Sequence, residues 1–409
     1  MRTPLFFFII LSLFFSCTEV EKPDPIDPDP PGIGNPADVG QMVESFGFDA
    51  FQKAVQLETD SENVCISPLS LSTALAMTWN GADGSTHTDM ANALKFGNKL
   101  EVDIDSGFDK LSNDLTPVSD SVIIEQANGL FWDEGRLIVY DAFLDAIEYR
   151  FGAEQQKLNF GDEQASKQVM NLWIEDKTKE KITDLIKEIK PSDVMFLINA
   201  LYYKGSWASA FNDQATQPGK FKKYDGTEVD AVYMHNDGIY MNYVGEDFMA
   251  VDLYFKGDDY AMTFILPEEE GNMGDFLTDF IVSDYRDLVE NRMTNDRILL
   301  TVPKFEIEYE LEMKEVLSAL GMGTAFIQGG ADLTRLGESS FGRLFIDRVL
   351  HKVKLEIDEY GAEGAAVTVV GVGVTSIPPQ IVFDQPFYFV LRHVETQAVL
   401  FIGLIANPS

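Results

Sequence analysis

The order of helical and strand-forming segments is the feature that most constrains how this chain can fold. Apolar residues at helical spacing predict helices at 43–57, 68–79, 143–151 and 164–186. Apolar and β-branched runs predict strands at 121–132, 194–203, 249–255, 261–267, 298–307, 349–357, 386–393 and 398–405. Helices that dominate early and strands that dominate late indicate an α+β fold rather than a regular βαβ alternation.

Composition supports one large globular unit and excludes some classes of function. The chain has 409 residues, 45% hydrophobic and 24% charged, which is ordinary for a globular protein with a sizeable core. From residue 38 onward there is no second linker and no internal repeat. With 31 basic and 67 acidic residues the formal net charge is −36, so the chain repels phosphate backbones and we expect no nucleic-acid partner.

Motifs for metals and cofactors are missing from the sequence. The four histidines include no pair at metal-ligand spacing, and the two cysteines cannot form a disulfide framework. The run GVGV from Gly371 to Val374 has the wrong spacing for a dinucleotide-binding turn, and there is no phosphate loop of the GxxxxGKS or GxxxxGKT type. We therefore predict no metal and no cofactor.

The N-terminus predicts export. Arg2 precedes an apolar run from Leu5 to Phe15, which is too short to span a bilayer comfortably and is typical of a secretory signal. A small residue followed by Cys17 at the end of this run resembles a bacterial lipobox, and a plain signal peptide with a chance cysteine is the alternative. The resemblance makes 1–16 a signal peptide and Cys17 the lipid-modified residue that anchors the protein to a membrane.

Residues 17–40 predict a tether. They are rich in Asp and Pro and have almost nothing to bury, which is typical of an extended segment that holds a domain off a surface. Together with the lipobox, this predicts a protein in a bacterial cell envelope, lipid-anchored to the outer membrane, on either its periplasmic face or the cell surface.

The segment EYGAEGAAVTVVGVGVTSIPPQ, at 359–380, is unusual for a soluble acidic protein. From Gly364 to Val374 it has no charge, and nearly every residue is small or β-branched. Its glycines weaken any strand that they interrupt, and Pro378 and Pro379 end ladder pairing. An exposed apolar segment of this kind carries a risk of aggregation.

Seven segments, in order along the chain, are NVCISPLSLSTALAMTWNGADGST, ANGLFWDEG, NLWIEDKTKEKITDLI, FLINALYYKGSW, VPKFEIEYELEMKEVLSALGM, HKVKLEIDEYGAEGAA and FDQPFYFVLRHVETQAVLFIGLIANPS. In this order they resemble segments of the serpins, the serine-protease-inhibitor superfamily. The resemblance covers 41–409. It implies one domain with three β-sheets, eight or nine helices and an exposed reactive loop at about 359–380.

The same resemblance implies an inhibitor and not an enzyme. In inhibitory serpins a target protease cleaves the loop and forms an acyl-enzyme. The loop then inserts as a new strand in the main sheet, and the protease is trapped irreversibly. A non-inhibitory binding lipoprotein on the same scaffold is the main alternative. A hydrolase ranks last, because the sequence has no nucleophile motif such as GxSxG.

The resemblance also assigns roles within the loop. The hinge matches Glu359, Gly361, Ala362, Glu363, Gly364, Ala365 and Ala366. Spacing counted forward from Glu359, and separately backward from Pro386, places the reactive bond at Thr375–Ser376. The loop residues expected to contact the protease around that bond are Val372, Gly373, Val374 and Ile377.

The composition of the loop suits insertion. Side chains along a strand alternate between faces, and in the family register the core-facing set is Ala362, Gly364, Ala366, Thr368, Val370 and Val372. A slip by one residue would bury Glu363, so the register is specified. About a dozen new backbone hydrogen bonds, at ~1 kcal/mol each, would contribute on the order of 10 kcal/mol. Val367 is bulkier than is usual in the family, which would slow insertion.

The loop also limits the choice of protease. From Leu355 to Leu391 there is no Lys or Arg, so trypsin-like enzymes fit poorly. Val374 and Thr375 before the predicted cut suit a small or shallow apolar pocket. Elastase-like and subtilisin-like serine proteases are therefore the expected partners, and papain-like cysteine proteases remain an alternative. Separately, we expect the inhibitor to be a monomer.

Two groups outside the loop match family positions. A polar cluster that controls opening of the main sheet matches Ser67, Ser70, Asn199 and His351. A plain buried hydrogen-bond network with no gating role is the alternative for these residues. Lys304 matches the ion-pair partner of Glu359 at the base of the loop, and exposed pairs of this kind contribute roughly 0–1 kcal/mol.

Overall fold

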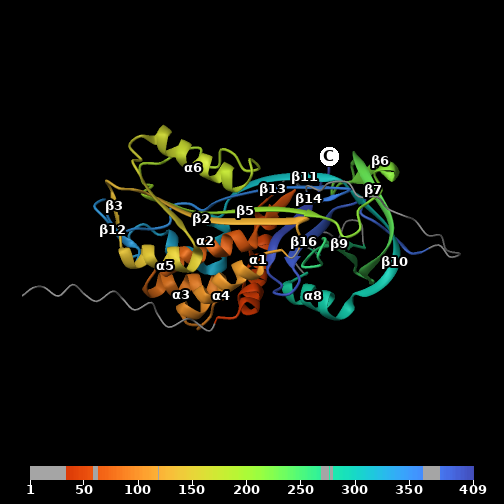
Figure 1. Cartoon of the computed structure of the whole chain (residues 1–409), viewed down its shortest axis with the longest axis horizontal. Helices are drawn as coiled ribbons and strands as arrows, with labels where there is room; N and C mark the ends of the chain where they lie inside the picture. The colour runs from red at the N-terminus through yellow and green to blue at the C-terminus, as the bar shows by residue number, and fades with distance from the viewer. Residues whose placement is uncertain (1–33, 59–62, 118, 269–275, 277–279, 363–377) are drawn as a thin grey trace, which may run out of the picture. The chain divides into compact units, whose positions relative to one another are not determined.

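The computed structural model describes residues 34–58, 63–117, 119–268, 276, 280–362 and 378–409 (Figure 1). In this part of the chain there are eight α-helices and three β-sheets, so the predicted α+β class with three sheets is confirmed. None of the helices in these ranges is long and apolar enough to cross a membrane. Cys17, the predicted lipidation site, lies outside the described residues.

Side chains cap the start of four of the eight described helices. The eight are α1 (Pro36–Leu57), α2 (Pro68–Asn80), α3 (Gly84–Ala93), α4 (Glu101–Asp114), α5 (Asp141–Phe151), α6 (Glu163–Lys177), α8 (Val282–Asp287) and α9 (Lys314–Leu317). Asn35 and Ser67 cap α1 and α2 by accepting hydrogen bonds from backbone N–H groups, and a proline follows each cap. Almost all of α2 is buried, so it lies at the centre of the core.

The main sheet has six strands. In spatial order they are β11 (Phe305–Glu312), β13 (Leu350–Asp358), β14 (Gly361–Ala362), β5 (Met195–Ser206), β2 (Val122–Asp133) and β4 (Glu154–Leu158). Helix α6 lies on one face of this sheet, and α2 and α5 lie on the other (Figure 1). Both faces of the central strands are therefore covered, and a strand added there would be buried on both sides.

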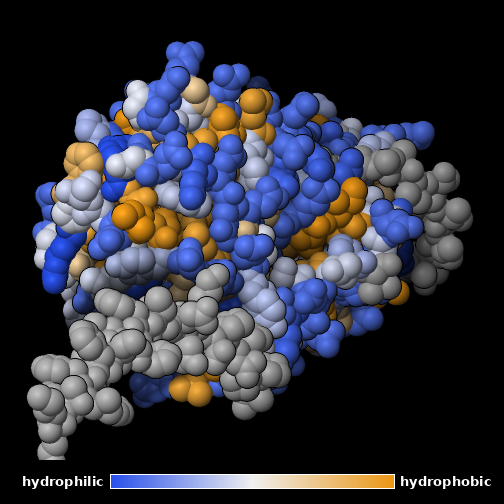
Figure 2. Space-filling model, turned by 60° about the vertical axis from the view of Figure 1, so that its left-hand side comes forward, coloured by the Kyte–Doolittle hydropathy of each residue, from blue (hydrophilic) through white to orange (hydrophobic). Residues whose placement is uncertain are grey.

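In the described part of the chain the second sheet has nine strands, and its buried side chains form a large part of the core. Its strands are β1 (Val64–Ile66), β17 (Val399–Ile405), β16 (Phe387–His393), β9 (Tyr260–Pro267), β8 (Phe248–Tyr254), β7 (Glu228–Val244), β10 (Thr294–Pro303) and β15 (Gln380–Val382), with β6 (Gln217–Lys222) paired to β7. A two-stranded sheet joins β12 (Gly337–Ser339) to β3 (Leu137–Val139). The face in Figure 2 is mainly hydrophilic with separate apolar patches, as expected when most apolar side chains lie in the core.

Two sequence predictions of secondary structure are wrong. The helix predicted at 164–186 ends at Lys177, and Lys179, Glu180 and Asp184 have φ of +50°, +64° and +52°. Apolar residues at 182, 185, 186 and 189 have helical spacing, but this segment forms neither helix nor strand and packs its apolar side chains on the main sheet. The single strand predicted at 298–307 is divided at Lys304, so that β10 and β11 belong to different sheets.

Candidate functional site

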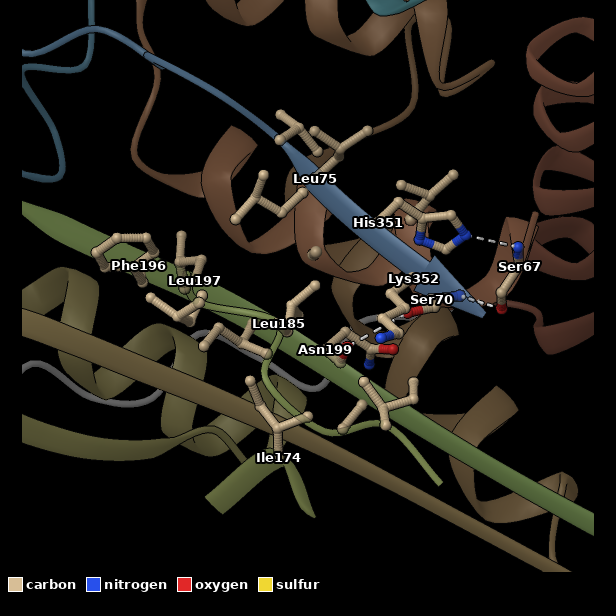
Figure 3. A pocket seen from close by; sticks show the side chains of 18 of the residues that line it. Ser67, Ser70, Leu75, Ile174, Leu185, Phe196, Leu197, Asn199, His351 and Lys352 are labelled. Atoms are coloured by element: carbon tan, nitrogen blue, oxygen red, sulfur yellow. Dashed lines mark hydrogen bonds between the residues drawn. The ribbon is translucent and has the colours of Figure 1, made fainter. Parts of the chain in front are cut away.

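A slot lies in the main sheet between β5 and β13. The two-residue strand β14 pairs with both neighbours at one end, where Ala362 lies opposite Gly205 of β5 and Ile357 of β13. Beyond Ala362, the described residues contain no strand between β5 and β13 and no pairing of these two strands with each other. A cavity of about 190 Å³ lies along both strands, between α2 on one face and the segment after α6 on the other (Figure 3).

Gly361 and Ala362 of the predicted hinge are paired in the sheet. Gly361 has φ +146°, and a Cβ at this position would lie 1.9 Å from the carbonyl oxygen of Gly205, so only glycine fits. Ala362 is fully buried in the core, which is the face that the sequence register assigned to it. The rest of the predicted hinge, the protease-contacting residues and the Thr375–Ser376 bond lie outside the described residues.

Glu359 is held firmly at the base of the loop. Its carboxylate accepts a hydrogen bond from Thr216 Oγ1 at 2.7 Å and pairs with Lys304 Nζ at 2.8 Å, so the structure brings the two predicted partners together. Burial alone would raise the pKa of Glu359, but the hydrogen bonds from Lys304 and Thr216 lower it below its usual value. Trp207 adds a hydrogen bond from its indole Nε1 to the carbonyl oxygen of Asp358 at 3.0 Å.

The four residues of the predicted sheet-opening cluster lie together at the slot (Figure 3). His351 Nε2 accepts a hydrogen bond from the backbone N–H of Ser67 at 2.9 Å, and Ser70 Oγ donates to the carbonyl oxygen of Asn199 at 3.4 Å. Burial lowers the pKa of His351 to about 4, so its ring is neutral and able to accept. These contacts tie the start of α2 to β13 and to β5.

The sequence interpretation missed one member of this network. Asn199 Nδ2 donates to Asn128 Oδ1 at 2.7 Å, and Asn128 Nδ2 donates to the carbonyl oxygen of Phe151 at 2.7 Å. The Oδ1 atom of Asn199 is buried without a hydrogen-bond partner among the described residues. The only signal for Asn128 was its place in the matching segment ANGLFWDEG.

The slot is also covered by residues 178–190, which we call the crossing segment. Its Ile182, Leu185 and Ile186 line the cavity. Asn171 of α6 holds it in place, because the side chain accepts from the N–H of Ile186 at 2.8 Å and donates to its carbonyl oxygen at 3.0 Å. On the far side, Lys187 pairs with Glu310 of β11 at 2.6 Å. The slot can therefore accept a new strand only if the crossing segment moves away from it.

Comparison with known proteins agrees with this geometry. A family model described as Serpin (serine protease inhibitor) matches residues 41–408. Alpha-1-antiproteinase of Rattus norvegicus is 30% identical over 378 residues, which cover 91% of this chain and 89% of the relative.

Two solved structures have the same fold. The thermophilic serpin tengpin, in its native state, aligns with a TM-score of 0.82 and 28% identity over 90% of this chain and 94% of its own. Human thyroxine-binding globulin in complex with thyroxine aligns with a TM-score of 0.83 and 27% identity over 91% of this chain and 99% of its own. With a family model that spans nearly the whole described domain, this chain belongs to the serpin family.

Proposed function

We propose that this protein is an irreversible suicide-substrate inhibitor of serine proteases with elastase-like or subtilisin-like specificity. The observation that carries the proposal is β14. Two hinge residues are paired between β5 and β13 at one end of a slot that has no strand in its described remainder. After cleavage, the residues that follow Ala362 would extend β14 along the slot.

The register of β14 supports this path. Ala362 lies opposite Gly205 of β5 and Ile357 of β13, and both pairings are antiparallel. Each residue further along the inserted strand would therefore lie opposite the preceding residue of β5 and of β13. In the same register, residue 368 would lie opposite both Asn199 and His351. Thr368 is in the small, uncharged, core-facing set, so it would meet the polar cluster with a hydroxyl group.

The expected targets follow from the loop sequence. Val374 and Thr375 before the predicted bond suit a shallow apolar specificity pocket, and papain-like cysteine proteases with such a pocket are a further class to test. The name of the rat relative, an antiproteinase, supports an inhibitory role. Incubation with an elastase-like protease, followed by denaturing electrophoresis, tests the proposal. A covalent complex is expected, together with a fragment cut at Thr375–Ser376.

A non-inhibitory binding role is the second candidate. The observation that favours it is the close structural match to thyroxine-binding globulin, which was solved in complex with thyroxine. Bulky Val367 in the hinge region also favours slow insertion. Cleavage of the loop by several proteases without any covalent complex would support this candidate and contradict the first.

We also propose that the inhibitor is anchored to the outer membrane of a bacterial cell through lipid at Cys17. The support is the short apolar N-terminal run, the small residue before Cys17 and the Asp- and Pro-rich tether that follows. Metabolic labelling with palmitate tests this proposal. Label is expected in the wild type and absent in Cys17→Ala, and equal labelling of both proteins would contradict it.

A further inference from the structure

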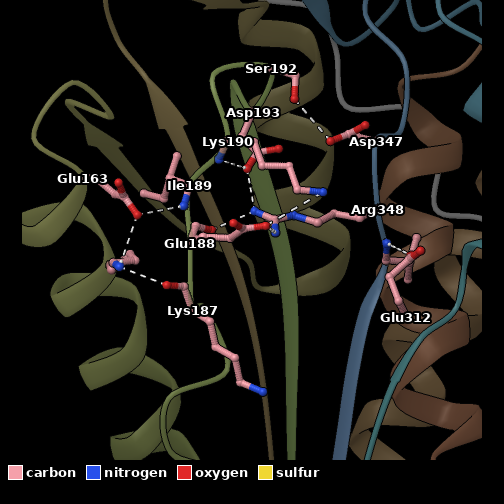
Figure 4. Close-up of polar contacts among 12 residues, drawn as sticks. Glu163, Lys187, Glu188, Ile189, Lys190, Ser192, Asp193, Glu312, Asp347 and Arg348 are labelled. Atoms are coloured by element: carbon pink, nitrogen blue, oxygen red, sulfur yellow. Dashed lines mark hydrogen bonds and ion pairs between the residues drawn. The ribbon is translucent and has the colours of Figure 1, made fainter.

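An ion pair joins β5 and β13 at the end of the slot opposite β14 (Figure 4). Asp193 lies two residues before β5, and Arg348 lies two residues before β13. Arg348 Nη2 is 2.5 Å from Asp193 Oδ2; Asp193 is buried, and the side chain of Arg348 is only 10% exposed. Beside this pair, Ser192 Oγ donates to Asp347 Oδ2 at 3.2 Å. We call these four residues the interstrand clasp.

The clasp is also connected to the crossing segment. Arg348 Nη2 donates to the carbonyl oxygen of Glu188 at 2.8 Å, and its guanidinium lies 5.6 Å from the centre of the Phe196 ring on β5. Asp193 Oδ2 also accepts from the backbone N–H of Lys190 at 2.7 Å. A single arginine therefore holds both the start of β5 and the cover of the slot.

The clasp lies across the path of the inserting strand. Continued in the register of β14, residue 371 would lie opposite Arg348 and residue 374 opposite Asp193. These positions directly precede the predicted Thr375–Ser376 bond. Strands that flank a third strand are about 9–10 Å apart, twice the usual spacing. A backbone passing between Asp193 and Arg348 would therefore separate the pair.

We propose that the interstrand clasp controls the last stage of loop insertion. While closed, it holds the native state against premature insertion and stops an inserting strand short of residues 371–374. Its opening lets insertion run to completion. The link to protease trapping rests on the proposed inhibitory function, but the control of strand entry does not.

Uptake of a synthetic peptide tests the clasp without any protease. The peptide has the sequence of residues 362–373, and its incorporation is followed by native electrophoresis of the full chain. Asp193→Asn keeps the shape of the side chain and removes the charge that Arg348 pairs with. Because removal of one partner of a buried ion pair strongly destabilises the closed state, uptake should quicken on the order of tenfold.

A matched control is available at the same end of the sheet. Asp133 pairs with Arg136 at 3.1 Å and is 6% exposed, but it lies at the end of β2, on the opposite side of β5 from the slot. Asp133→Asn should lower the thermal stability of the native protein and leave the rate of uptake unchanged. After the loop is cut and inserted, Asp193→Asn should unfold at the wild-type temperature, whereas Asp133→Asn should still unfold early.

Either of two results would refute the proposed role of the clasp. One is a rate of peptide uptake in Asp193→Asn that equals the wild-type rate, and the other is an equal acceleration of uptake in Asp133→Asn. If Asp193→Asn fails to fold, Arg348→Lys replaces it. Lysine keeps the positive charge, but it lacks the guanidinium group that bonds both the carboxylate of Asp193 and the carbonyl oxygen of Glu188. Faster peptide uptake is again expected. A wild type that traps no protease yet shows clasp-dependent uptake would refute the inhibitory function and retain the clasp.

Discussion

Replacement of Ala362 by arginine tests the insertion mechanism most directly. Ala362 is fully buried between β5 and β13, with its methyl group in the main core. An arginine there must either bury an unpaired guanidinium, at a cost of several kcal/mol, or leave the sheet and take the hinge with it. Insertion as a whole contributes on the order of 10 kcal/mol, so it would remain favourable overall, but its first step would be opposed.

The expected effect is kinetic. If about 3 kcal/mol of the penalty is present when the hinge begins to insert, insertion slows roughly a hundredfold, since each 1.4 kcal/mol is a factor of ten. Hydrolysis of the acyl-enzyme would then outrun trapping, and the inhibitor would become a substrate. The assay measures how many molecules are consumed for each protease inhibited, together with the yield of covalent complex on denaturing gels.

A control variant places an arginine at the C-terminal end of the loop. Gln380 in β15 is exposed, so Gln380→Arg adds a guanidinium without burying it. It should leave the yield of complex for each cleavage unchanged. A wild-type complex yield from Ala362→Arg would refute insertion through the slot.

Three further predictions concern buried groups. Gly361→Ala should displace the hinge, because its Cβ would clash with the carbonyl oxygen of Gly205, and cleavage of the loop region by a non-target protease should quicken; unchanged cleavage would contradict the close approach. Burial raises the pKa of Glu44 from 4.5 to about 7, with a partial offset from Arg286. The native state therefore holds this proton more tightly than the unfolded state, and about 3 kcal/mol of stability should be lost as pH rises from 4.5 to 7. Thermal unfolding at pH 5 and pH 8 should show this loss in the wild type and a smaller one in Glu44→Gln. Burial lowers the pKa of His351 from 6.5 to about 4, so the unfolded state binds this proton more tightly, and stability should fall by about 3 kcal/mol as pH falls from 6.5 to 4. His351→Gln should be less sensitive to acid over that range, and equal sensitivity would show that His351 is not the titrating group.

The sequence by itself determined the family and much of the local backbone. The order of seven matching segments predicted the fold, and Ser67 followed by proline predicted the start of α2. These features are readable because capping and turn chemistry depend on residues close together in the chain. The face of Ala362 could also be predicted, since strand side chains alternate.

Only the tertiary structure decided how the slot is covered and closed. The crossing segment has apolar residues at helical spacing, but it packs on the main sheet without forming a helix, because tertiary packing overrides a local pattern. Asp193 and Arg348 are 155 residues apart, and nothing local marks them as partners among the many charged residues of this chain. Their contact exists because β5 and β13 begin side by side at one end of the sheet, and that proximity is a property of the folded chain alone.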